Sequence, residues 1–318
     1  MHIVAGIRKD SDEATIQELA KAGADEFFLG FVPEYWSREF GYELSPNRRY
    51  FSGAQITDPS HLKRLCAAAT DSGRAVALTF NEHIHTTATW NLGQRLLDDA
   101  VGAGISAIIV ADPLLVPEMA GRYPGISLHL SGDAGVYNSA AAEELCNQGI
   151  SRIIFPRELE APEMASIISA TNAKDREFEA FVMGEPCVYD GARCFTEHGF
   201  DFGCDFCNDH QMKIVRSRHG GQARPLEPPQ EAALQDPSAR QAWTLGKCGL
   251  CALPTLEKIG ITHCKVPGRS SIAGPAIALV RRMLDAPDAG PDLARSLLGA
   301  PALCAGGHFC YYPELNND

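Results

Sequence analysis

The stretch RIIFPRELEAPEMASIISATNAKDREFEAFVMG (152–184) contains one complete strand–helix–strand unit. Residues 152–158 and 177–184 hold short apolar runs, as strands buried on both faces do. Residues 161–170 lie between them and are a helix candidate of ordinary length. A strand, a helix and a second strand in this order predict two parallel strands joined by a helical crossover.

The same alternation continues along the chain in both directions. Further strands are predicted at 2–7, 25–31, 75–82, 106–112, 126–132 and 262–269, and further helices at 11–23, 58–73, 91–103, 113–121, 139–149, 251–259 and 271–285. Ser11 or Asp12 is the expected cap of the first helix, and Gly23 is its expected stop. Eight strands, each followed by a helix, predict an α/β fold of the (βα)8 TIM-like barrel type over residues 1–285.

An open, doubly wound sheet is the alternative, because it also alternates strands and helices. No GxGxxG motif follows the first predicted strand. The dinucleotide-binding form of that fold therefore loses support, and the number of units in this length favours the barrel.

A long insertion at 185–250 follows the seventh predicted strand, and it contains the Pro-, Gln- and Arg-rich section 216–241. It leaves the carboxyl end of a strand, which is the face where barrel active sites lie. After the last helix, residues 286–318 form a Gly-, Pro- and Ala-rich tail or cap. Its cysteines, Cys304 and Cys310, have no assigned role at this stage.

The charge balance restricts the partners. The 318 residues include 28 basic and 40 acidic side chains, for a net charge of −12. Binding of nucleic acid by the whole surface is therefore disfavoured, although a local basic patch around Arg216 and Arg218 is left open. The first residues do not resemble a signal peptide, and no apolar run is long enough for a membrane span. These features predict a cytoplasmic protein.

Cysteines are concentrated near the insertion. The spacing C-x6-C-x9-C-x2-C is followed by a second C-x2-C, which gives six candidate metal ligands: Cys187, Cys194, Cys204, Cys207, Cys248 and Cys251. In a reducing cytosol, such clustering indicates metal chemistry. Thiolates suit a 4Fe-4S cluster, which we favour, or a zinc ion as the alternative. Cys66, Cys146 and Cys264 lie in apolar segments and are expected to be buried small side chains.

Polar residues near the ends of the predicted strands should line the mouth of the barrel. The catalytic candidates are His129, Asp133, Arg157, Glu158 and Glu185, and the substrate-binding candidates are Asn81, Lys265 and Arg269, the last two for an anionic group. Each has a structural alternative. His129 would be a hydrogen-bonded core residue, Arg157 and Glu158 a structural ion pair, and Asp112, at another strand end, a helix cap. His83 and His85 are a weak signal for metal binding.

Several motifs resemble one known family. The segment FVMGEPCVYDGARC, followed by GCDFC, is similar to the signature of the U32 family, historically named collagenase-like peptidases. AGADEFFLG, SLHLSGDAGVYNSAAAEEL, RIIFPRELE and GITHCKVPGRSS resemble further family landmarks, in the family order, over about residues 20–285. The resemblance implies a barrel with a 4Fe-4S cluster on four cysteines. It also implies oxygen-independent hydroxylation of the ubiquinone ring or of RNA bases, protease activity being the older assignment.

The resemblance assigns individual residues. Cys187 and Cys194 match the first two ligands of the family, and Cys204 matches the third. The fourth ligand is open between Cys207, Cys248 and Cys251. The sequence departs from the family pattern at Met183, Asp133 and Pro267, where the family has His, Gln and Glu. These departures predict a divergent member with a different substrate.

Three function classes follow from these observations. The favoured one is an oxygen-independent hydroxylase or oxidoreductase that acts on a small aromatic or anionic molecule, with an unnamed electron donor. The second is a U32-type peptidase, metal-free or zinc-stabilised, although the sequence has neither HExxH nor an obvious Ser-His-Asp arrangement. The third is a non-catalytic iron–sulfur subunit that pairs with a related barrel protein as a heterodimer.

Overall fold

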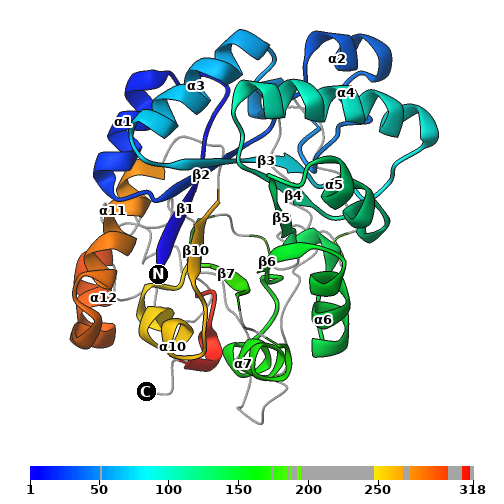
Figure 1. The fold of residues 1–318 in the computed structure, drawn as a ribbon. Helices are drawn as coiled ribbons and strands as arrows, with labels where there is room; N and C mark the ends of the chain where they lie inside the picture. Colours follow the sequence, from blue (N-terminus) through cyan, green and yellow to red (C-terminus); the bar gives the residue numbers. More distant parts are fainter. Residues whose placement is uncertain are drawn as a thin grey trace.

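The computed structural model describes residues 1–50, 52–172, 175–184, 187, 192, 194, 247–267, 273–299 and 310–315. It confirms the predicted barrel (Figure 1). The parallel strands close in the order β1-β10-β7-β6-β5-β4-β3-β2, so every barrel strand has two neighbours and the open sheet is excluded. They are β1 (His2–Gly6), β2 (Glu26–Leu29), β3 (Ala75–Phe80), β4 (Ala107–Val110), β5 (Ser127–Leu130), β6 (Ile150–Ile154), β7 (Glu177–Phe181) and β10 (His263–Val266).

Helices surround the barrel (Figure 1). The predicted ones are α1 (Glu13–Ala22), α3 (Pro59–Asp71), α4 (Thr87–Ala103), α5 (Val116–Arg122), α6 (Ser139–Asn147), α7 (Ala161–Ala170), α10 (Leu253–Lys258) and α11 (Ala273–Leu284). Two more, α2 (Glu34–Phe40) and α12 (Gly290–Leu298), lie in segments that the sequence left as loop and tail. The seven-residue α2 spans only two turns, which is too short for its apolar spacing to stand out.

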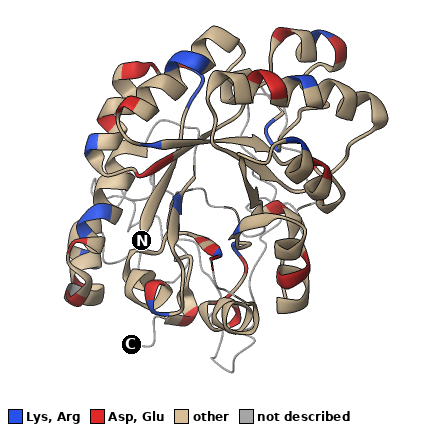
Figure 2. Ribbon diagram, viewed as in Figure 1, with Lys and Arg blue, Asp and Glu red and all other residues tan. Residues whose placement is uncertain are grey.

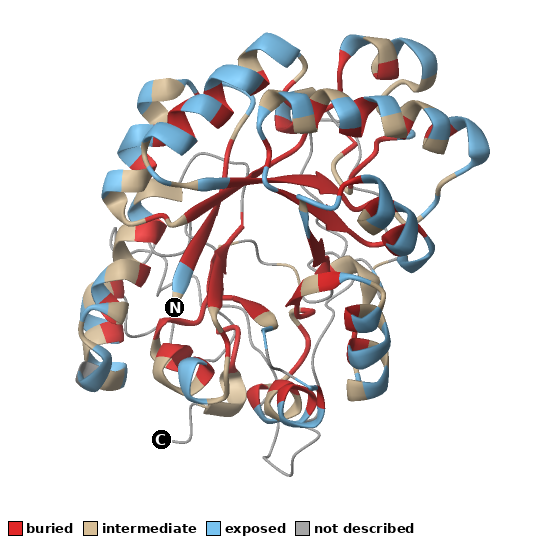
Figure 3. Cartoon of the chain, in the orientation of Figure 1, coloured by how far each residue is buried: buried red, intermediate tan, exposed pale blue. Residues whose placement is uncertain are grey.

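Burial follows the layers of the fold. The strands are buried almost throughout, whereas the helices are buried only on the side that faces them (Figure 3). Acidic and basic residues are interspersed on the outer helices (Figure 2). Among the described residues, no helix has the length and apolarity needed to cross a membrane.

The first and last barrel helices are joined at Gly23. Asp12 caps α1 by accepting a hydrogen bond from the Thr15 amide at 2.8 Å, and Gly23 ends it with φ 115°. A Cβ on Gly23 would lie 2.8 Å from Arg281 Nε, so a larger residue does not fit. Arg281 in α11 donates to the Gly23 carbonyl at 2.7 Å and to Asp25 at 2.5 Å. The end of the last barrel helix is thereby fixed to the start of the second strand.

The two ends of the insertion are paired. The predicted strand 177–184 is divided in two, because β7 ends at Phe181 and the short β8 (Met183–Gly184) leaves the barrel. β8 pairs antiparallel with β9 (Lys247–Cys248), at the other end of the insertion. Residues 310–315 attach at the same place, where Tyr312 OH donates to the Phe181 carbonyl at 2.8 Å. The insertion therefore starts and finishes at one point beside the carboxyl end of β7.

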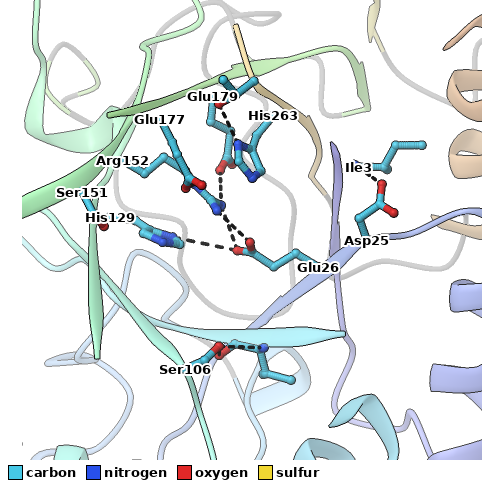
Figure 4. Close-up of polar contacts among 12 residues, drawn as sticks. Ile3, Asp25, Glu26, Ser106, His129, Ser151, Arg152, Glu177, Glu179 and His263 are labelled. Carbon is cyan, nitrogen blue, oxygen red and sulfur yellow. Dashed lines mark hydrogen bonds and ion pairs between the residues drawn. The ribbon is translucent and has the colours of Figure 1, made fainter. Parts of the chain in front are cut away.

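The barrel interior contains charged side chains (Figure 4). Arg152 of β6 donates to both carboxylate oxygens of Glu26 on β2, at 2.9 and 2.8 Å, and to Glu179 on β7 at 3.2 Å. Lys265 of β10 donates to the other oxygen of Glu179 at 2.7 Å. All four are less than 9% exposed. Glu26, Arg152, Glu179 and Lys265, here called the interior charge network, carry two negative and two positive charges and join four strands across the barrel.

The network shifts the pKa values of its members in different directions. Burial alone would raise the pKa of Glu179, but Lys265 and Arg152 outweigh it and lower that pKa to about 2. Burial raises the pKa of Glu26 despite the two hydrogen bonds from Arg152. The pKa of Arg152 is in turn raised by the carboxylates around it, which outweigh the effect of its own burial. Removal of one partner would leave a buried charge uncompensated, which is costly in a low-dielectric interior.

We therefore expect Arg152→Met to lower the free energy of unfolding by about 3–5 kcal/mol, because Glu26 and Glu179 lose their shared cation. Urea denaturation followed by circular dichroism measures this change. Arg122→Met is the matched control, because Arg122 forms a surface ion pair with Asp98 at 2.7 Å and should contribute little. Equal effects of the two substitutions would show that the interior charge network is not a principal stabilising element.

Candidate active site at the carboxyl end of the barrel

The side chains that follow the strands form a polar cluster at the mouth of the barrel. Asn81 follows β3, and Ser131 and Asp133 follow β5. Asn81 Nδ2 donates to Ser131 Oγ at 3.1 Å and to Asp133 Oδ2 at 2.6 Å. The carboxylate of Asp133 also accepts from Ser131 Oγ at 3.0 Å. Two predicted site residues, Asn81 and Asp133, are thus brought together.

This arrangement fixes the orientation of the Asn81 amide. A flipped amide would place its oxygen against the Asp133 carboxylate, so the nitrogen must face Asp133. Asn81 Oδ1 is buried and has no hydrogen-bond partner in the described part of the chain. A buried acceptor without a partner is uncommon in proteins and suggests a position for a water molecule or a ligand. Asn81 can therefore accept a hydrogen bond from an N–H or O–H group.

A second cluster comes from the loop after β2. Arg48 donates to Tyr50 OH at 2.7 Å, and Tyr50 OH makes a short hydrogen bond to Glu82. Burial, followed by the hydrogen bond to Glu82, raises the pKa of the Tyr50 phenol. The sequence did not single out Arg48 or Tyr50, because a loop residue carries no periodic signal and these contacts are specific to the folded chain.

The Arg48 cluster also locates part of the insertion. Burial alone would lower the pKa of Arg48, but Tyr50, Asp133, Glu82 and the Cys194 thiol raise it. The thiol of Cys194 therefore lies within electrostatic range of Arg48. Ala192 lies against the loop after β5, since a Cβ built on Gly135 would be 2.5 Å from the Ala192 Cβ. Among the described residues of the insertion, Ala192 and Cys194 thus lie near the mouth, on the side of β3 and β5.

Arg157 and Glu158 each contact another residue of the mouth. The Arg157 guanidinium carbon lies 4.0 Å from the centre of the Phe181 ring, a cation–π geometry. Glu158 accepts a hydrogen bond from Tyr137 OH at 2.5 Å. Both residues follow β6, so the sequence placed them correctly at the end of a strand.

His129 and Lys265 lie deeper in the barrel than the sequence suggested. His129 is 3% exposed, and its Nδ1 has no hydrogen-bond partner in the described residues, since Glu26 Oε1 is 3.9 Å away. Burial and the nearby Arg152 hold the pKa of His129 well below 6.5, so the ring is neutral. Lys265 binds Glu179 and lies 4.1 Å from the centre of the Phe28 ring. Its charge is therefore already paired with Glu179 within the interior charge network, which makes Lys265 a weaker candidate for binding an anionic substrate.

Other candidates have local roles or fall outside the described residues. His83 Nε2 contacts the Asp133 carbonyl at 2.9 Å, and His85 Nε2 contacts the Glu82 carbonyl at 3.2 Å, so the two rings are used separately. Asp112 accepts from the Leu114 amide at 2.9 Å, which is the helix-cap role considered above. The candidates Glu185, Arg269, Cys204 and Cys207 lie outside the described residues.

The described cysteines separate into two groups. Cys66, Cys146 and Cys264 are buried, and burial raises the pKa of Cys66 and Cys264 to about 12, as expected for packing residues. Cys187 and Cys194 are partly buried near the start of the insertion, and Cys248 and Cys251 lie at its far end. Thiols at these positions suit iron or zinc by their chemistry. Within the described residues they do not form a group of three or more metal-binding side chains, so the cluster stays a prediction.

Comparison with known proteins gives a consistent result. The family model for peptidase family U32 matches residues 12–290. The tRNA hydroxylation protein P1 of Bacillus subtilis (strain 168) is 25% identical over 282 residues, which are 85% of this chain and 60% of that protein. A 23S rRNA 5-hydroxycytidine synthase of Escherichia coli (strain K12) is 29% identical over 187 residues, 59% of this chain and 25% of that protein. The chain spans 60% or less of the length of these relatives.

A solved structure, that of the U32 peptidase Mk0906, is 15% identical, with a TM-score of 0.45. The alignment covers 57% of this chain and 69% of that protein. Assignment of the present fold depends on the observed strand order and closure.

The histidines inside the barrel predict a pH dependence of stability. Burial, followed by the nearby Arg152, lowers the pKa of His263 to about 4, whereas an unfolded histidine titrates near 6.5. Between these values the unfolded chain binds a proton that the folded chain does not, so stability falls as the pH decreases from about 6.5 to 4. In His263→Gln, the slope of unfolding free energy against pH should decrease by up to about 1.4 kcal/mol per pH unit. Urea titrations across this range measure the slope, and an unchanged slope would contradict the expectation.

Proposed function

Because this chain belongs to peptidase family U32, we propose that it is a cluster-dependent, oxygen-independent hydroxylase that acts on an aromatic ring. The match to a tRNA hydroxylation protein over 85% of the chain is the observation that carries the proposal. The polar mouth supports it, because the insertion with its cysteines leaves the barrel there, beside residues that can position a substrate.

In this proposal, Cys187, Cys194 and Cys204 hold a 4Fe-4S cluster, and the fourth ligand is Cys207, Cys248 or Cys251. Three described observations support the first two. Cys187 follows β8 by only a few residues, Cys194 lies near Arg48, and Ala192 packs against the loop after β5. When bound, the cluster would supply one-electron redox chemistry next to the substrate. Arg48 would balance part of the negative charge of the thiolates.

The residues of the mouth would bind and orient the substrate. Asn81, held by Ser131 and Asp133, offers Oδ1 to a donor group of the ring. Arg157 and Phe181 present a stacked cation and aromatic face. Tyr50 donates a hydrogen bond to Glu82, and its raised pKa keeps the phenol protonated. Each of these groups can bind and orient an aromatic substrate without forming a covalent bond to it.

We propose a small aromatic or anionic molecule as the substrate, because the net charge of −12 disfavours extended contact with nucleic acid. A base within RNA is the second candidate, and the names of two relatives favour it. A U32-type peptidase and a non-catalytic iron–sulfur partner of a related barrel protein are the competing functions. The peptidase predicts that no hydroxylated product depends on this chain. The partner role predicts that the purified chain is inactive and co-purifies with a related barrel protein.

The cluster has a direct test. We expect anaerobically purified protein to be brown, with a broad absorbance near roughly 400 nm and about four iron atoms per chain. Cys187→Ala and Cys194→Ala should lose the iron, because each removes a ligand. Cys66→Ala is the matched control and should keep it, since Cys66 is buried in the hydrophobic core on α3. A colourless protein that holds a single zinc ion under the same conditions would show that the metal is zinc.

The reaction and its substrate are tested together in the organism that carries the gene. Deletion should abolish one hydroxylated product, found by mass spectrometry of small aromatic metabolites and of digested tRNA and rRNA in parallel. The parent protein should restore the product, and Cys187→Ala should not. A product that appears only in the digested RNA would show that the substrate is a base in RNA and not a small molecule. Unchanged profiles in all samples would refute the hydroxylase function.

A further inference from the structure

Side chains from two strands that are not neighbours meet at the mouth of the barrel. β4 lies between β3 and β5, yet Asn81 beyond β3 donates to Ser131 and Asp133 beyond β5. The strand register, continued by one residue, places Asn81, Ala111 and Ser131 in one layer. Ser131 stands two residues after His129, which faces the barrel interior, so it points inward as well (Figure 4). The small side chain of Ala111 leaves room for this contact on the inner side of β4.

Two committed acceptors face the Asn81 amide nitrogen. Ser131 Oγ donates its single proton to Asp133 Oδ2 at 3.0 Å, so toward Asn81 it accepts, at 3.1 Å. Asp133 Oδ2 accepts from the same nitrogen at 2.6 Å. A half turn of the amide would oppose its oxygen to both acceptors. The Asn81 amide is therefore held in one orientation, with Oδ1 turned away from Ser131 and Asp133.

The chain around Asp133 holds this residue in place independently of Asn81. Its amide donates to Ser131 Oγ at 3.2 Å, and its carbonyl accepts from His83 Nε2 at 2.9 Å. Both contacts lie in the short turn Gly132–Ala134 that follows β5. The Asp133 carboxylate is thus the fixed partner, and the Asn81 amide adopts the orientation that the carboxylate imposes.

This orientation decides which groups Asn81 can bind. Asn81 is 8% exposed, and its Oδ1 is buried without a hydrogen-bond partner in the described part of the chain. Only a donor can complete a buried acceptor. A ring that presents a lone pair there would leave two desolvated acceptors face to face, which costs more than the hydrogen bond contributes. Sites of this kind discriminate strongly between a group that donates and an isostere that does not.

We propose that Asp133 is a positioning residue that makes the mouth selective for small aromatic rings whose edge carries an N–H group. Asp133 contacts Asn81 and not the ring, and it acts by fixing Oδ1 as the atom that the ring meets. This selectivity deepens the proposed function and rests on it for the presence of an aromatic substrate. It adds the chemical polarity that the substrate must have.

Two substitutions separate this role from a merely structural one. In Asp133→Asn, the new amide at position 133 can donate to Asn81 Oδ1 and leave Nδ2 facing the ring, so the preference for a donor should be lost. Asn81→Asp combined with Asp133→Asn exchanges the two side chains. The carboxylate at position 81 then accepts from the amide at position 133 with one oxygen and offers the other oxygen to the ring, so the preference should return.

Pyrrole-2-carboxylate and furan-2-carboxylate are the probes. Both are planar monoanions of nearly the same shape, and they differ in one ring atom, an N–H donor in the first and an oxygen lone pair in the second. Their dissociation constants are measured by ligand-observed NMR titration of the full chain, purified anaerobically. General damage to the mouth would weaken both acids alike, whereas a change of orientation alters the ratio of the two constants.

We expect the parent protein to bind the pyrrole acid about tenfold more tightly, as one hydrogen bond gained against two opposed acceptors implies. The ratio should fall to about twofold or reverse in Asp133→Asn and return in the exchanged double variant. Asp98→Asn is the matched control and should keep the parent ratio, because Asp98 accepts from Arg122 and Tyr123 on the outer surface. Circular dichroism shows that each variant is folded.

A second measurement observes the Asn81 amide itself. With ¹⁵N-labelled asparagine, its signal is the one absent from Asn81→Asp. Its protons should exchange slowly with water in the parent, since both are buried in hydrogen bonds, and faster in Asp133→Asn. Equal affinities of the parent for the two acids, no binding of either acid, or a ratio that Asp133→Asn leaves unchanged would each overturn the proposal.

Failure of this selectivity and failure of the hydroxylase are distinguishable. A chain that prefers the pyrrole acid but yields no hydroxylated product would refute the proposed function alone. A brown, active protein that binds the two acids equally would refute the role of Asp133 alone.

Discussion

Arg152 is the residue on which the interior of this barrel depends. Its guanidinium group reaches Glu26, Glu177 and Glu179, and Glu179 in turn holds Lys265. Barrels of this type are usually filled by branched apolar side chains, whose hydrophobic contacts are non-directional. Ion pairs with defined geometry tolerate shifts less well, so the network favours one alignment of β2, β6, β7 and β10. The same strands carry the loops of the mouth, whose relative positions follow from that alignment.

The interior and the mouth impose opposite requirements on polar groups. In the interior, charges are matched, and His129 is held neutral beside them. At the mouth, the Asn81 amide nitrogen is fully used, whereas its oxygen has no partner among the residues that the structure describes. Such an imbalance costs stability and is retained in proteins where a ligand or water completes the contact. The barrel thus combines paired charges in its centre with an acceptor at its mouth that a ligand or water can complete.

Sequence reasoning predicted the barrel because its evidence is local. Runs such as AIIV in β4 are apolar on both faces, and each is followed by a helix, so no long-range contact is needed to recognise them. The interior charge network could not be found this way, since Arg152 and Glu26 are 126 residues apart and each is one polar residue in an apolar strand. Strand ends did place Asn81 and Asp133 at the mouth, where the structure brings them together. Arg48 and Tyr50 were missed because only folding brings their loop to β3.

The pairing of β8 with β9 holds the two ends of the insertion together in a small sheet that is separate from the barrel. The insertion begins at β8 and ends at β9, and these two-residue strands pair with each other. The two ends of the insertion are therefore fixed at adjacent points. The entropy of closing such a loop rises only with the logarithm of its length. Evolution can therefore lengthen, shorten or replace this segment at small energetic cost, with β7 and β10 undisturbed. A different segment whose ends fit the same two-strand base could therefore be grafted at this position without altering the barrel.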